Sequence, residues 1–358
     1  TLLVTGNVDF NGDLDVDGTT NLDVVDIDGA ANFAADVTFA DGADIITASA
    51  GTSNVRVGVN AGNSIQSGGN QNTVIGDEAG TAITTGDGNS LVGKDAGRLI
   101  TTGQYNTTVG FDSLENTTTA NDNTAMGYYS LQANTTGASN AAFGRQALAS
   151  NTTAANNTAV GYFSLAANTT GTRNTAVGME SLKTVITGVD CAALGYKALR
   201  LNTGNSNTGL GSETLGTNSS GASNTAVGAA ALFANTTASN NTAVGASALI
   251  ANTTGASNTA VGSLALDANT TGSFNTAHGV HALGANIVGV ECTAVGYAAL
   301  DSNTGSYNTA VGSDTLGSNT SGTFNTAIGR NALLANTTGG SNTAVGSLSL
   351  DACTTGNS

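Results

Sequence analysis

Three aspartates at alternate positions form the clearest metal-like pattern in the chain. Asp13, Asp15 and Asp17 are followed by a glycine and match the first half of an EF-hand calcium loop. The twelfth residue of such a loop is a bidentate Glu, whereas here it is Val24, and no helical pattern flanks the segment. Aspartates that alternate along the solvent face of a strand explain the pattern better, and calcium bound between chains is the alternative.

Histidine and cysteine offer no catalytic set. His278 and His281 are spaced for a metal site on a helix, but no helix is expected here, and His278 takes a position that is Val in other repeats. Cys191, Cys292 and Cys353 are far apart in the sequence, and three separated thiols do not make a disulfide framework. We therefore expect no His-based catalysis and assign no catalytic, cofactor-binding or metal-binding residue.

Carboxylates and glycosylation motifs add no enzymatic signal. Acidic residues in the repeats fall at variable positions, and no pair recurs in a setting suited to acid–base chemistry. A depolymerase of the tailspike kind would need such a pair, so we expect no enzyme. Asn-Thr-Thr is formally a glycosylation acceptor, but turn chemistry explains its regular recurrence better. Its occurrences include Asn106, Asn134, Asn151, Asn168, Asn235, Asn252, Asn269 and Asn336.

A repeat of about 17 residues organises positions 54–358. Its consensus is Asn-Thr-Ala-Val-Gly-x-x-Ala-Leu-x-Ala-Asn-Thr-Thr-Gly-x-x, and the first Gly recurs 18 times from Gly58 to Gly346, in steps of 17 with one of 18 and two of 16. A helical repeat needs roughly 30 residues or more. Two short strands and two turns fit this unit. We therefore predict an all-β parallel solenoid, or β-roll, with 18 coils stacked about 4.8 Å apart.

The composition suits a core that is one side chain thick. Pro is absent, which fits a fold in which every backbone N–H pairs between coils. Val and Leu columns are expected to fill the interior, while Ala lets the two strands approach. The repeat Gly suits a positive φ or a close neighbour. Stacked Asn side chains are expected to form amide ladders, and the ladder residues we assign are Asn157, Asn174, Asn224, Asn241 and Asn258.

Composition and charge exclude several classes of protein. Of 358 residues, 9% are charged and 4% are aromatic, and Trp is absent, so the chain cannot fill the thick core of an ordinary enzyme domain. The net charge is -16 and the nine basic residues are scattered singly, which argues against nucleic acid and anionic membranes as partners. No run of 18 apolar residues is present, so we expect no membrane insertion.

Residues 1–53 differ from the rest, with ten acidic residues and no basic one. They divide into six-residue units, such as 7–12, 13–18 and 19–24, whose apolar residues alternate with polar ones as in a half-buried strand. Six residues per face suit a triangular β-prism built by one chain or by three intertwined chains. We favour three chains, because so short a segment makes few coils alone. An acidic stalk is therefore predicted before the rod.

Aromatic residues fall at two positions of the repeat. One set directly follows the repeat Gly and is the candidate receptor or interface set: Phe111, Tyr128, Tyr162, Tyr196 and Tyr297. A second set directly precedes the repeat Asn: Tyr105, Phe274, Tyr307 and Phe324. Rings on the outside of a solenoid either stack on sugar rings or fill gaps between chains, and we favour packing between chains.

The repeat resembles those of bacteriophage tail-fibre proteins and related bacterial surface fibres. It is similar, less closely, to the shorter Asn-Ser-Val-Ala-Ile-Gly repeat of trimeric autotransporter adhesin heads. The match covers residues 72–358. The resemblance implies a parallel β-roll or β-helix, usually a homotrimer, with a role in attachment. A trimer would bury one face of each thin roll, which a single chain leaves exposed.

We therefore expect a structural fibre, such as a tail-fibre or adhesin shaft, that acts in attachment outside the cell. Its expected partners are further copies of itself and, as an option, a cell-surface glycan. The alternative is a self-assembling extracellular filament with no receptor. An ice-binding solenoid is less favoured, because the repeat offers adjacent Thr-Thr and not a flat Thr-x-Thr row. A depolymerase tailspike comes last.

Overall fold

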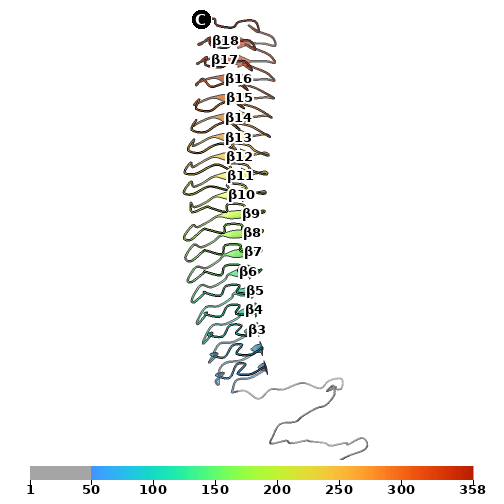
Figure 1. Cartoon of the computed structure of the whole chain (residues 1–358), viewed down its shortest axis with the longest axis vertical. Helices are drawn as coiled ribbons and strands as arrows, with labels where there is room; N and C mark the ends of the chain where they lie inside the picture. The colour runs from blue at the N-terminus through green and yellow to red at the C-terminus, as the bar shows by residue number, and fades with distance from the viewer. Residues whose placement is uncertain (1–49, 358) are drawn as a thin grey trace, which may run out of the picture. The chain divides into compact units, whose positions relative to one another are not determined.

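Residues 50–357 are described by the computed structural model, and they form a rod of stacked coils (Figure 1). The predicted acidic stalk, residues 1–53, lies outside the described residues except for its last four. Each coil carries one strand of three residues, and no helix occurs in residues 50–357. The prediction of an all-β parallel solenoid is confirmed, with a coil of about 17 residues.

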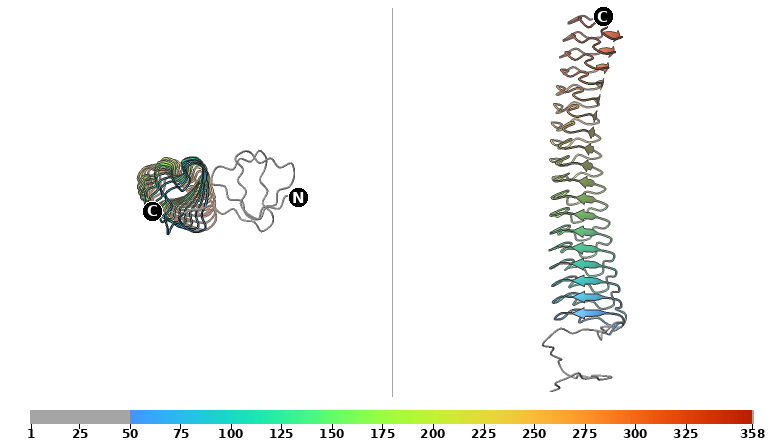
Figure 2. Two further views of the ribbon diagram at one scale, coloured as in Figure 1. Left: turned by 90° about the horizontal axis from the view of Figure 1, so that it is seen from below. Right: turned by 90° about the vertical axis from the view of Figure 1, so that its right-hand side faces the viewer.

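Eighteen strands form a single parallel sheet along one side of the rod (Figure 2). They are β1 (Val55–Val57), β2 (Thr73–Ile75), β3 (Ser90–Val92), β4 (Thr107–Val109), β5 (Thr124–Met126), β6 (Ala141–Phe143), β7 (Thr158–Val160), β8 (Thr175–Val177), β9 (Ala192–Leu194), β10 (Thr208–Leu210), β11 (Thr225–Val227), β12 (Thr242–Val244), β13 (Thr259–Val261), β14 (Thr276–His278), β15 (Thr293–Val295), β16 (Thr309–Val311), β17 (Thr326–Ile328) and β18 (Thr343–Val345). Each strand pairs with the next one in sequence, as Thr158 pairs with Thr175 between β7 and β8. At the usual spacing of strands, the rod is about 80 Å long.

The interior is built from Ala, Leu and Asn, and the prediction that Val fills it is wrong. Alternation along the strand turns Asn157 and Ala159 inward and leaves Val160 on the outer face, 37% exposed. The same pattern recurs in the other Asn-Thr-Ala-Val coils. Ala therefore forms the sheet side of the core, and Leu165 meets it from the opposite side of the coil.

The second apolar piece of the repeat is a turn and not a second strand. Ser164 and Leu165 are consecutive and both fully buried, which a strand with alternating faces cannot achieve. Leu165 has a left-handed backbone with φ 49°, and this conformation recurs at the equivalent Leu of every coil from Leu114 to Leu350. Such a backbone is costly for a non-glycine residue, so burial of the Leu side chain and pairing to the neighbouring coils must hold it.

The first three coils fill the core with different residues. Gly80 stands where later coils have Leu, and Ile83 stands where later coils have the second Asn. A Cβ added to Gly80 would lie 2.8 Å from Cδ1 of both Ile83 and Leu91. The larger side chains of the strand and the far turn thus fill the volume that Leu takes elsewhere.

The repeat Gly satisfies both conditions expected of it. Gly161 has φ 131°, and a Cβ there would lie 2.7 Å from the carbonyl oxygen of Gly178 in the next coil. Its N–H donates to the carbonyl of Phe143 in the coil before, at 2.8 Å. The column of glycines therefore lets successive backbones approach closely enough for the coils to pair.

Gly161→Ala is expected to destabilise the rod by at least about 2 kcal/mol, because it combines a strained φ with a clash against the next coil. Thermal and denaturant unfolding followed by circular dichroism would measure the loss.

Gly346→Ala is the matched control for this substitution. Gly346 has a similar φ of 125°, but the nearest heavy atom to its Cβ position is 4.0 Å away. The control should lose less stability than Gly161→Ala. Equal losses in the two variants would show that backbone strain alone, and not the approach between coils, demands glycine.

Candidate interaction surface

The predicted Asn ladder residues are all buried along the sheet side of the core. Asn157, Asn174, Asn224, Asn241 and Asn258 are each 0–1% exposed. The N–H of Asn174 donates to Oδ1 of Asn157 at 2.9 Å, and the N–H of Asn258 donates in the same way to Asn241. The Nδ2 of Asn157 donates to the carbonyl of Gly171 at 2.9 Å. This column therefore joins coils through bonds from backbone to side chain and, between residues 54 and 157, also from amide to amide.

The second Asn column lies next to the first, since Asn241 and Asn252 both donate to the carbonyl of Gly255, and it forms an amide ladder of its own. Asn252 Nδ2 donates to Asn235 Oδ1 at 3.0 Å and to the carbonyl of Gly255 at 3.0 Å. We assigned no ladder residue there, although the sequence spacing of this column is as regular as that of the first. The ladder stops where Val185 replaces Asn, which leaves Oδ1 of Asn168 buried without a partner.

The cysteines of the two shorter coils take Asn positions in the first column. The N–H of Cys191 donates to Asn174 Oδ1 at 3.0 Å, and its Sγ lies 3.3 Å from the carbonyl oxygen of Gly204. Burial raises the pKa of the Cys191 and Cys292 thiols, which keeps them uncharged. Within residues 50–357, no group of three His, Cys, Asp or Glu side chains is placed to hold a metal ion.

The residues after the repeat Gly form an exposed stack along the rod, in which the aromatic rings cover one another. Phe111 and Tyr128 stack with centroids 5.6 Å apart. The Arg145 guanidinium lies 5.6 Å from the ring centres of both Tyr128 and Tyr162. Of the five predicted residues, these three therefore lie in one column, with their faces largely occupied by neighbours.

The two remaining predicted aromatics lie apart from that stack. Tyr196 packs beside Lys197, whose Nζ is 4.7 Å from the ring centre. Tyr297 is 59% exposed and lies six coils further along the rod. The second aromatic set contains one stacked pair, Tyr307 and Phe324, with centroids 4.8 Å apart.

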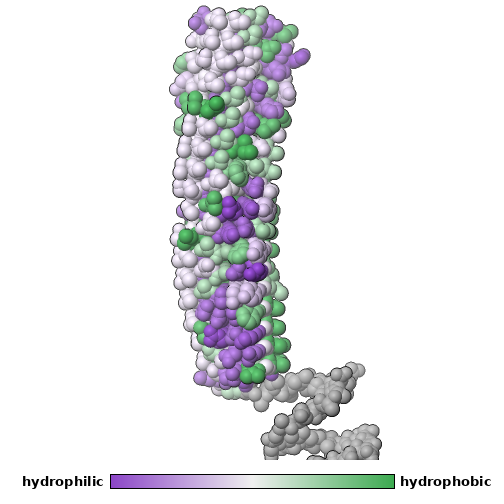
Figure 3. Space-filling model, in the orientation of Figure 1, coloured by the Kyte–Doolittle hydropathy of each residue, from purple (hydrophilic) through white to green (hydrophobic). Residues whose placement is uncertain are grey.

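A stripe of apolar side chains runs along the outer face of the sheet, and the sequence analysis placed it inside. It consists of the third residue of every strand and is called the valine column here. Seventeen of its 18 members are apolar, and the exception is the exposed His278. Hydrophobic residues recur along one edge of the rod in the space-filling view (Figure 3). Beside it, the first strand residue presents an outward row that is mostly Thr.

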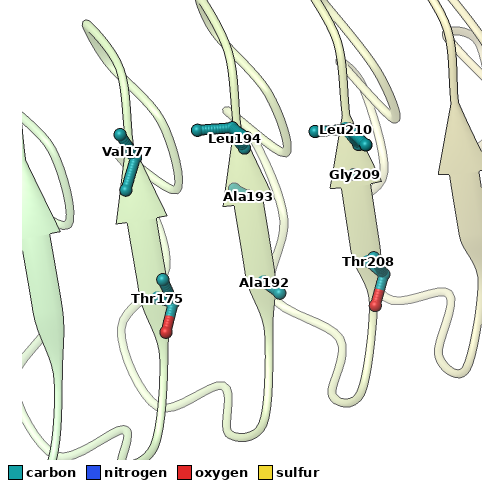
Figure 4. Close-up of a pocket in the computed structure, with 8 residues that line it drawn as sticks. All are labelled: Thr175, Val177, Ala192, Ala193, Leu194, Thr208, Gly209 and Leu210. Carbon is teal, nitrogen blue, oxygen red and sulfur yellow. The ribbon is translucent and has the colours of Figure 1, made fainter.

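The valine column has a shallow apolar hollow on β8–β10 (Figure 4). Ala192 replaces Thr in the row beside the column, so the surface dips between Thr175 and Thr208. Leu194 and Leu210 replace Val on the neighbouring row. The hollow has a volume of about 280 Å³ and is lined almost wholly by apolar atoms.

One carboxylate pair, Asp267 and Asp301, is brought together only by the fold. The two residues are two coils apart, and Gly284 lies between them. A Cβ on Gly284 would be 2.5 Å from Asp301 Oδ1 and 3.6 Å from Asp267 Oδ1, so both oxygens lie close to the same point on the rod. Burial, with a contribution from Asp301, raises the pKa of Asp267. A separation of two whole repeats gives no local motif, so the sequence analysis found no such pair.

The fold defines the chain as a β-solenoid repeat protein. No family model and no curated protein matches its sequence. Among residues 50–357, no helix could cross a membrane.

Asn235→Val, which copies the natural Val185, is expected to destabilise the rod by about 2–4 kcal/mol. It removes the donor to Asn218 Oδ1, at 2.7 Å, and the acceptor for Asn252 inside the ladder, and buried polar groups left without partners cost about 1–3 kcal/mol each. Thr237→Ala, at an exposed position of the same coil, should change stability by less than about 0.5 kcal/mol. Chemical denaturation would compare them, and equal effects would contradict a stabilising ladder.

Asp267→Asn is expected to raise the melting temperature at pH 7. Because burial raises the pKa of Asp267, the folded state holds the proton more tightly than the unfolded chain, so stability falls as pH rises through the ordinary Asp pKa. The gain from Asn should disappear near pH 3, where the carboxyl is protonated in both states. Thermal melts at both pH values, with the exposed Asp351→Asn as control, would measure it. A gain that persisted at pH 3 would contradict this cause.

Proposed function

We propose that the protein is the shaft of an extracellular attachment fibre, in which three copies pack side by side through their valine columns. The observation that carries this proposal is the valine column itself. It runs along all 18 strands, and members such as Val160 and Leu194 are 37% and 48% exposed. Single apolar side chains are common on protein surfaces, but a continuous apolar stripe is typical of an interaction site.

The size of the stripe suits a stable interface. About 80 Å of rod and about 10 Å of strand width present about 800 Å² per chain, which is the area that each partner contributes to a standard protein interface. The partner is most simply another copy, because the stripe repeats with the coil spacing of the rod, and a second rod has the same spacing. Three copies, rather than two, follow from the resemblance to tail-fibre and adhesin repeats.

The proposed role in attachment follows from the side chains that the trimer would leave exposed to solvent. The turns that carry variable residues alternate with the sheet around each coil, so their charged and aromatic side chains remain accessible beside a covered sheet face. A rod that displays side chains in columns presents the same chemistry over many coils. Such a surface suits a partner that is itself extended, such as a surface polymer of a cell.

The double variant Val160→Asp/Val244→Asp is expected to convert the trimer to monomers. Both residues are exposed in one chain, so the coils should still stack, whereas carboxylates in an apolar interface leave charges buried without partners. Native mass spectrometry and sedimentation would give the mass, and circular dichroism would show that the fold survives. The control variant Thr170→Asp, at an exposed position in the same coil as Val160, should leave the trimer intact. A monomeric unmodified chain would overturn the proposed assembly.

A self-assembling filament is the second candidate, and one observation favours it. Leu333 is fully buried beneath the last coil, whereas the equivalent Leu350 in that coil is 52% exposed. A further coil stacked on β18 would cover Leu350, whether that coil belongs to the same chain or to another copy. Negative-stain images of the purified chain would separate the two: rods of uniform length favour the shaft, and long filaments favour end-to-end assembly.

A further inference from the structure

We propose that coils 6–11 of the rod, the coils that begin at β6–β11, bind a linear anionic polysaccharide with widely spaced carboxylates along the turn face. The inference rests on the proposed attachment function and names the chemistry of its ligand. Two hollows of similar composition lie along this face, which is formed by the second, fifth and sixth residues after the repeat Gly. Each combines an aromatic ring, a cation and a floor of small residues.

The first hollow, of about 300 Å³, spans coils 6–8. Its floor is Ala166 and Ala167, and Phe163 and Lys183 stand beside them. Lys183 Nζ lies 5.0 Å from the Phe163 ring centre and 2.8 Å from Glu180 Oε1. Gln146 also lines the hollow, and its Oε1 has no hydrogen-bond partner. The side chains therefore offer a ring, a cation and an amide.

The second hollow, of about 80 Å³, spans coils 9–11 and repeats this chemistry. The Phe233 ring lies over Gly216, where a Cβ would come within 2.8 Å of ring atom Cε2. Lys197 and Arg200 line one side, and Glu213 provides an acceptor. Phe163 and Phe233 are four coils apart, or about 19 Å. A repeating ligand that lies along the axis could reach both hollows.

Charge favours an anion at this part of the rod. Residues 145–200 carry five of the nine basic residues and two of the 25 acidic ones, a formal charge of +3 in a chain of -16. Among residues 50–357, Arg145, Lys197 and Arg200 have no carboxylate within ion-pair distance, whereas Lys94, Arg98, Arg173 and Lys183 do. Of the five cations without acidic partners among the described residues, three therefore lie on coils 6 and 9, and the other two are Arg56 and Arg330.

Charge density selects a glycan over nucleic acid. Double-stranded DNA carries one charge per about 1.7 Å, and acidic residues nearer the two ends of the rod, such as Asp95 and Asp301, would repel it. Ionic interactions are screened beyond about 8 Å at physiological salt, so a polymer with a carboxylate on each sugar, or on every second one, can pair with the basic zone alone. The aromatic rings can stack on the uncharged faces of the sugars, and the acceptor side chains can bind the sugar hydroxyl groups.

The test is the binding of the full chain to a uronic acid hexasaccharide from alginate, measured by calorimetry, with neutral dextran oligosaccharide as the comparison. The uronate should bind and dextran should not, and the affinity should fall as salt rises. Arg200→Ala should weaken binding about tenfold, because a charged hydrogen bond is lost. Phe233→Ala should weaken it as well.

Arg330→Ala is the matched control, because Arg330 also has no ion pair among the described residues but lies in coil 17. It should leave affinity unchanged. Circular dichroism would check the fold of each variant, and Lys197→Ala provides a second test if Arg200→Ala unfolds. No binding at millimolar uronate, equal binding of dextran, equal loss in Arg330→Ala, or tighter binding of a DNA duplex would each overturn the proposal. A monomeric chain that still binds uronate would overturn only the assembly proposal.

Discussion

The stacking of each coil in register on the next is the constraint on which the rest of the structure depends. A coil this short has too few side chains to enclose its own polar backbone, so its N–H and C=O groups must find partners one coil above and below. Close stacking in turn requires the repeat Gly, since a Cβ on Gly161 would strike the Gly178 carbonyl. It also requires buried amides such as Asn157 and Asn235 to bridge the turns between coils.

Because stacking fixes the inward positions, variation between coils is confined to the outward ones. Those positions line up from coil to coil, so any bias in residue type becomes a stripe along the rod. The valine column and the stack around Arg145 arise in this way. The inward positions change only in ways that preserve the core. Gly80 lacks the Leu side chain that later coils have at this position, and Ile83 and Leu91 fill the space. Local chemistry can therefore differ along the rod while the backbone remains regular.

Most of the fold could be predicted from spacing alone, and most of the surface could not. The recurrence of Gly58 to Gly346 determined the number of residues per coil, and the absence of Pro agreed with parallel pairing. The error over Val160 arose because hydrophobicity was taken to mean burial. In a coil this thin, the period of the strand decides which residues point inward, and the small Ala159 rather than the larger Val faces the core.

The sequence by itself determined the coil length, the glycine requirement and the two Asn columns, because each is a pattern repeated at a fixed step. Only the tertiary structure decided which side chains meet across coils. Asp267 with Asp301, Arg145 between two tyrosines, and Phe233 over Gly216 are such cases. Residues one or two repeats apart become neighbours when coils stack, and whether they touch depends on the direction in which the backbone turns each side chain. Spacing predicts that a column exists, but the left-handed turns, such as those at Leu165 and Phe163, determine which way it faces.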